Sequence, residues 1–161
     1  MSNTHLATYL NNHLSGAMAA VELLQHLENT HAGTEVQQFA AALHTDIEAD
    51  RQDLLRLMGE LGVPESRVRE AVAWLAEKAT RLQLRLDDPE QGNFLLFEIL
   101  EALSIGIDGK AALWTALAAA AEITPRLRAR DYDGLLRRAR SQRERVDGRR
   151  LSLARSTLSG S

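Results

Sequence analysis

The helix that decides this fold lies at residues 34–61, which read TEVQQFAAALHTDIEADRQDLLRLMGEL. Steps of four and three residues along it select one apolar helix face, which a single charged residue interrupts. The members of this face are Val36, Ala40, Leu43, Ile47, Asp50, Leu54, Leu57 and Leu61. In front of the face, Thr34 and Gln37 form a capping-box pattern, in which Gln37 reaches back to the amide of Thr34. The stretch therefore predicts a helix over 34–61.

A second apolar face precedes the first and predicts a helix over about 4–29. Its members are Leu6, Leu10, His13, Ala17, Ala20, Leu24 and Leu27, of which only His13 is polar. An antiparallel hairpin about the turn at Ala32 brings His13 and Asp50 to nearly the same height, because they lie 19 and 18 residues from Ala32. A lone carboxylate on an apolar face costs several kcal/mol, so we predict that the two side chains pair. We interpret the pair as a register-setting contact; the alternative is a general base oriented by a carboxylate.

The rest of the chain predicts three more helices, over about 65–86, 94–122 and 127–156, with a loop at 87–93. Aromatic residues make up 4% of the 161 residues and only three prolines occur, which favours an all-α fold. We find no linker or repeat and expect a single helical domain over 1–161. The helix at 94–122 is apolar on more than one side, so we expect it to be central or to form a homodimer interface.

Composition excludes several functions. The chain has no cysteine, so it has no disulfide and no thiolate metal site. Residues 126–161 carry 11 arginines and 4 acids, but we interpret them as a solvated helix face paired with the acidic remainder, and expect no nucleic-acid partner. The apolar run at 111–123 is shorter than the roughly 20 residues that cross a bilayer. With no secretory signal recognisable at the start, we expect a cytoplasmic protein without membrane contact.

The order of the helices resembles that of the ferritin-like superfamily. A long crossover helix at 65–86 would make the helices at 34–61 and 94–122 parallel, as in ferritin-like bundles. This resemblance covers almost the whole chain and rests on helix order. It implies a ferritin-like antiparallel four-helix bundle with an extra crossover helix, five helices in all. The alternative is a simple up-down five-helix bundle.

The resemblance also implies a set of metal ligands. Di-iron members of the superfamily carry a glutamate on each of two helices and a Glu-x-x-His pair on each of the other two. The corresponding candidates here are Glu22, Glu48 and Glu101, with His13 as a possible addition, for iron, manganese or zinc. After Glu48, however, Arg51 stands where the pattern has histidine, and its charge would repel a cation.

We therefore expect a degenerate metal site, no cofactor, and a non-enzymatic protein with a binding or structural role. Two alternatives stay open: a metal-binding oxidoreductase or metal carrier, and a protein that binds an apolar small molecule between its alanine-rich helices. A further candidate site is the stretch 106–110, where a loosened helical turn would present Asp108 and Lys110 to a ligand. Small residues that allow close helix approach are the other interpretation of this stretch.

The pairing of His13 with Asp50 is directly testable. We predict that Asp50→Ala and His13→Ala each lower the free energy of unfolding by about 1 to 3 kcal/mol, and that the double variant loses clearly less than their sum, because both changes remove one interaction. Denaturant unfolding of the four proteins measures this coupling. Strict additivity would show that the two side chains do not interact.

Overall fold

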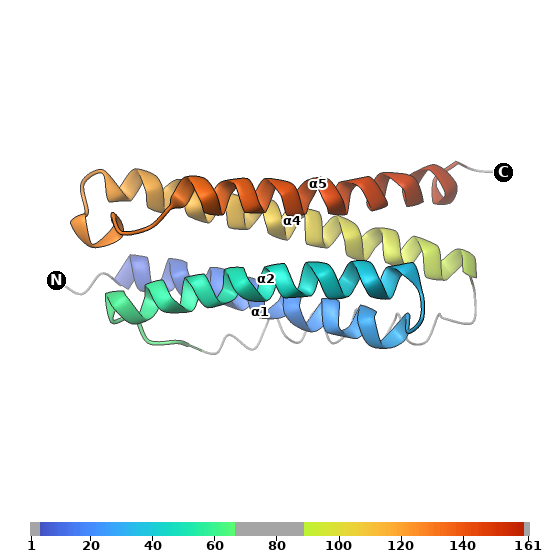
Figure 1. The fold of residues 1–161 in the computed structure, drawn as a ribbon, viewed down its shortest axis with the longest axis horizontal. Coiled ribbons are helices and arrows are strands. Elements are labelled where there is room, and N and C mark those ends of the chain that lie inside the picture. Colours follow the sequence, from blue (N-terminus) through green and yellow to red (C-terminus); the bar gives the residue numbers. More distant parts are fainter. Residues whose placement is uncertain (1–3, 67–88, 160–161) are drawn as a thin grey trace. The chain divides into compact units, whose positions relative to one another are not determined.

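The computed structural model describes residues 4–66 and 89–159, and within these ranges the protein is all-helical (Figure 1). The chain divides into two compact units, Met1–Ala79 and Thr80–Ser161. Each unit contains one antiparallel helical hairpin, which is described below by itself. The all-α prediction is confirmed. No helix in the described ranges is long and apolar enough to cross a membrane.

The first hairpin consists of α1 (Thr4–Thr30) and α2 (Glu35–Leu61). Between them, Thr34 caps α2, because its Oγ1 accepts a hydrogen bond from the Gln37 amide at 3.3 Å. Gln37 Oε1 in turn accepts from the amide of Gly33 at 2.7 Å, one residue before the amide that the sequence predicted. Gly33 has a φ of 78°, in the left-handed region that glycine adopts without strain. The predicted N-cap is therefore confirmed, with the reciprocal bond shifted by one residue.

The core of this hairpin follows the predicted faces most closely on α2. Six successive members of the α2 face are buried: Ala40, Leu43, Ile47, Asp50, Leu54 and Leu57. On α1 the buried line runs through Leu10, Leu14, Leu24 and Leu27, so His13 lies half-buried at its border. The centre of the α1 face is thus rotated slightly from the one that the sequence suggested.

A glycine ends α2. Gly62 has a φ of 68°, its amide donates to Gly59 O at 3.1 Å, and the amide of Val63 donates to Met58 O at 2.9 Å. These two bonds form a Schellman motif, which satisfies carbonyl groups that the helix itself leaves unpaired. The left-handed conformation at Gly62 is required by this geometry.

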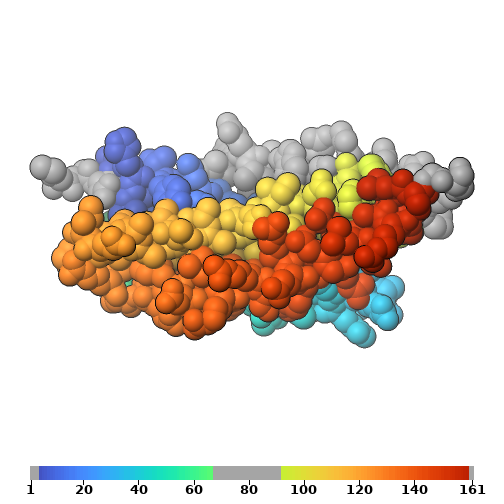
Figure 2. Space-filling model, turned by 90° about the horizontal axis from the view of Figure 1, so that it is seen from above, coloured from blue at the N-terminus to red at the C-terminus, as the bar shows by residue number. Residues whose placement is uncertain are grey.

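The second hairpin consists of α4 (Pro89–Ala121), a short 3₁₀ turn η1 (Pro125–Leu127) and α5 (Tyr132–Thr157). In Figure 2, α4 in yellow to orange and α5 in orange to red lie side by side. The helix α4 begins at Pro89, five residues before the predicted residue 94. Proline suits the first turn of a helix, because its fixed φ is helical and its missing N–H would be unpaired there anyway.

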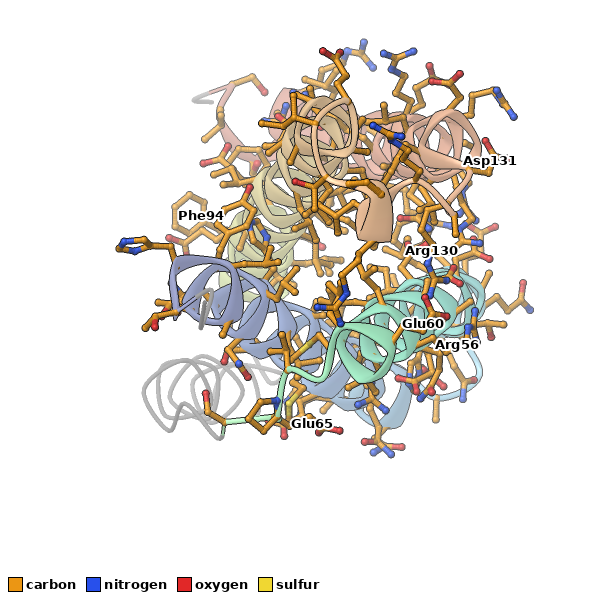
Figure 3. All side chains as sticks on the ribbon, turned by 90° about the vertical axis from the view of Figure 1, so that its left-hand side faces the viewer. Arg56, Glu60, Glu65, Phe94, Arg130 and Asp131 are labelled. Atoms are coloured by element: carbon orange, nitrogen blue, oxygen red, sulfur yellow. The ribbon has the colours of Figure 1, made fainter. Side chains whose placement is uncertain are left out.

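The helix α5 begins at Tyr132 instead of the predicted residue 127, because the connection folds on itself. The hydroxyl of Tyr132 donates to Leu127 O at 2.7 Å, and both residues are buried. Asp131, which is labelled in Figure 3, then caps the helix by accepting from the Gly134 amide at 2.9 Å. Five residues that the sequence assigned to the helix therefore form the turn.

The predicted helix at 65–86 lies almost entirely outside the described residues. Glu65 and Ser66, its first two residues, are not helical. The crossover connection on which the ferritin-like plan depends therefore stays a prediction, as does the single domain over 1–161.

We predict opposite effects for two glycines three residues apart in and after α2. Gly62→Ala should destabilise the protein by about 1 to 2 kcal/mol, because a Cβ is strained at this positive φ. Gly59→Ala should stabilise it by about 0.5 to 1 kcal/mol, because Gly59 is helical and a Cβ there would meet nothing within 4 Å. Thermal or denaturant unfolding of both variants measures the signs. Equal effects of the two variants would contradict the assigned backbone conformations.

Candidate functional site

A group of polar side chains joins α4 to α5, and Asp147 is its centre. The carboxylate of Asp147 accepts hydrogen bonds from Ser104 Oγ at 2.8 Å, Arg150 Nε at 3.0 Å and Arg143 Nε at 3.2 Å. Ser104 belongs to α4, whereas both arginines lie on α5, four residues before and three residues after Asp147. At this spacing, side chains of one helix meet on its surface. Asp147 therefore connects the two helices and orients two guanidinium groups.

Both arginines also reach acids on α4. Arg143 donates to Asp108, and Arg150 Nη1 donates to Glu101 Oε2 at 3.1 Å. We call these six residues the polar ladder: Glu101, Ser104 and Asp108 on α4, and Arg143, Asp147 and Arg150 on α5. Asp108 and Glu101 are about half exposed, so each ion pair contributes little free energy. Acids and arginines alternate along the ladder, and their contacts form together at only one position of α5 along α4. The ladder therefore fixes the register of the two helices.

Two opposing effects act on the pKa of Asp147. Desolvation raises it, but hydrogen bonds from Ser104 and Arg150, together with the charge of Arg150, outweigh this effect. The pKa of Asp147 therefore lies below its ordinary value, and the carboxylate is ionised at neutral pH. A charge held in this way is suited to fixing arginines and unsuited to accepting a proton from a substrate.

Lys110, one of the two predicted ligand contacts, also faces α5. Its Nζ donates a hydrogen bond to Oε1 of Gln142, whose side chain is fully buried. The helix α4 continues without interruption through 106–110. Lys110 and Asp108 therefore both bond to α5, to Gln142 and Arg143 respectively, and the turn that the sequence suggested to be loosened is helical.

The predicted ligand Glu48 is held by neighbours on α2. Arg51 donates to its carboxylate twice, at 2.8 and 2.7 Å, and Gln52 donates once at 2.8 Å. The hydrogen bonds from Arg51 are the main reason why the pKa of Glu48 falls from 4.5 to about 2, although burial acts in the opposite direction. Arg51 thus occupies both oxygens of the Glu48 carboxylate with directed hydrogen bonds.

The other predicted ligands lie on both hairpins. Glu22 is exposed on α1, and Glu101 is bonded to Arg150 in the other hairpin. Within the two described ranges, no group of three or more histidines or acids could hold a metal ion.

His13 lies half-buried on α1 and Asp50 lies buried on α2, in a hairpin whose buried side chains are mostly apolar. The ring of His13 contacts Tyr9 edge to face, with 4.7 Å between ring centroids. Burial lowers the pKa of His13, so its imidazole is neutral at neutral pH. Asp50 is buried on α2, with 3% of its surface exposed. The pairing of the two side chains stays a prediction.

The sequence did not reveal two polar contacts in the first hairpin. His44 Nδ1 lies 2.5 Å from Glu28 Oε1 and so links α2 to α1. Asn11 donates to Pro64 O at 3.1 Å and accepts from the Ser66 amide at 2.7 Å, which ties the chain after α2 to α1. In the sequence, the signal for the second contact was Asn11 itself, a polar residue next to the apolar face of the predicted helix 4–29.

Comparisons with protein-family models, with curated proteins and with solved structures found no match to this chain. Its function is therefore inferred from its own residues.

The low pKa of Glu48 predicts a pH dependence of stability. A carboxyl group whose pKa is lower in the folded state stabilises that state above its unfolded pKa, and this contribution disappears as the pH falls toward the folded value. Glu48→Gln should therefore make the loss of stability between about pH 5 and pH 2 less steep. Urea unfolding across this range measures it, with exposed Glu22→Gln as the control. The proposed ion pair is disproved if Glu48→Gln and wild type lose stability in parallel.

Proposed function

We propose that this protein is a non-enzymatic helical-bundle protein that works by binding through its helix faces, and that it acts as a cytoplasmic homodimer. The observation that carries the proposal is which partners the carboxylates of Glu48 and Glu101 have. Both carboxylates, which the ferritin-like resemblance would assign to a metal, are bonded to arginines, Arg51 and Arg150 respectively.

An arginine in this position opposes metal binding for two reasons. Its guanidinium occupies the carboxylate oxygens with directed hydrogen bonds, and its positive charge repels a cation a few ångströms away. Arg51 cannot release its proton at any physiological pH, so the opposition is permanent. Carboxylates used in this way hold arginines, within α2 for Glu48 and between α4 and α5 for Glu101, and do not carry out chemistry.

The ferritin-like plan remains part of the proposal, with a degenerate metal site. Two antiparallel hairpins of long helices, α1 with α2 and α4 with α5, are what such a bundle requires of its main helices. The apolar surface that α4 keeps exposed supports the association of two chains and is treated below.

Elemental analysis tests the proposal. Protein purified without an affinity tag, incubated with Fe²⁺, Mn²⁺ or Zn²⁺ and then dialysed, should retain well under one metal ion per chain. A stoichiometry of about one or two ions per chain, as in a di-metal bundle, would overturn it.

Two variants strengthen this test. Glu48→Ala and Glu101→Ala should not change the metal content, because neither carboxylate is used for a cation. Metal that is bound by wild type and lost in either variant would instead establish the metal-carrier or oxidoreductase alternative.

A further inference from the structure

From Ile105 onward, the side of α4 that faces away from its buried residues is apolar. It consists of Ile105, Gly109, Ala112, Ala116, Ala119 and Ile123, which we call the outer stripe. Ile105 is 66% exposed and Ile123 is 85% exposed. The three alanines are exposed as well, and Gly109 is half-buried. Ile123 lies in the turn that continues α4, where its amide donates to Ala120 O at 3.3 Å.

The outer stripe has the spacing of a helix interface. Its members follow one another at steps of four, three, four, three and four residues, and none is charged. Trp114, which is buried, lies nine residues from either isoleucine, or two and a half helical turns, and therefore points to the opposite side of α4. The stripe is thus a second apolar face, which the α4–α5 hairpin does not use.

The outer stripe is symmetric about residue 114. Ile105 and Ile123 are equally far from this position, as are Gly109 and Ala119, and Ala112 and Ala116. A face with this symmetry can pack antiparallel on a copy of itself, because a two-fold axis at residue 114 brings each member opposite a residue of similar size.

We propose that the outer stripe packs on the outer stripe of a second copy of this chain, antiparallel, with a two-fold axis at residue 114. This inference rests on the proposed homodimer and names its interface. Each Ile105 then meets Ile123 of the other copy. The small residues at the centre allow the two helix axes to approach to about 8 Å.

The helix dipoles favour the antiparallel direction, because they align favourably when the two copies of α4 run in opposite directions. Glu101 and Asp108 are already bonded to Arg150 and Arg143 on α5, so these acids do not set the direction of packing.

Gly109 permits the close approach that this packing needs, because it has no side chain on the stripe. A Cβ built at this position would meet nothing within 4 Å, as at the helical Gly59 and Gly106.

Disulfide cross-linking tests the register. The chain contains no cysteine, so introduced cysteines give an unambiguous signal. In Gly109→Cys/Ala119→Cys, each introduced thiol faces the other kind on the second copy, and oxidation should link the chains covalently. In Ala119→Cys alone, the two thiols are ten residues apart along the helices, about 15 Å, which is too far for a disulfide. Non-reducing electrophoresis separates the two results. Linkage by the single cysteine, or none by the pair, overturns the antiparallel register.

Light scattering tests the interface itself. Wild type should show the mass of a dimer at micromolar concentration. Ile105→Glu/Ile123→Glu should raise the dissociation constant at least about tenfold, because it places charges in the contact. Leu151→Glu, which changes an exposed leucine on α5, should leave it unchanged. A dimer insensitive to the isoleucine changes overturns this interface and leaves the homodimer intact. A wild-type monomer overturns both, whereas the metal content tests the non-enzymatic role separately.

Discussion

The burial of apolar faces between antiparallel helices is the constraint on which each hairpin depends. In proteins most of the stability of a helix comes from the packing of its apolar face, so the paired faces supply most of the free energy that keeps these helices formed. Leu10, Leu24 and Leu43 are completely buried in the first hairpin, and Trp114 and Val146 nearly or completely so in the second. The caps, ion pairs and turns act on helices that this burial already holds together.

Polar groups add specificity to these apolar faces. Apolar side chains tolerate sliding of one helix along another, whereas the bonds of Asp147 to Ser104 and to two arginines hold at one register only. Asn11 plays a comparable part in the first hairpin by holding the chain that follows α2. Charged residues that the sequence suggested as metal ligands or ligand contacts, such as Glu101 and Asp108, thus help to align α4 with α5.

Local signals made α2 predictable to within one residue, because Thr34 and the turn around Gly62 determine its ends from within a few residues. The start of α5 was not predictable in this way, because it depends on Tyr132 folding back to Leu127. The candidate site was harder still. The sequence identified Asp108, Lys110, Glu48 and Glu101, but their partners follow from side-chain geometry and from the register of α4 against α5, which periodicity alone leaves open.

The burial of Trp114 has a spectroscopic consequence. Its indole N–H meets no acceptor within the described part of the chain, and only 1% of its surface is exposed. An indole in such dry surroundings emits at shorter wavelength than one in water. The described part of the first hairpin contains no tryptophan, whereas Trp74 lies outside the described residues. In a protein that carries Trp74→Phe, fluorescence would therefore report on the surroundings of Trp114 in α4 alone. If its unfolding transition coincided with that of the total helix content, measured by circular dichroism, the two hairpins would unfold as one cooperative unit.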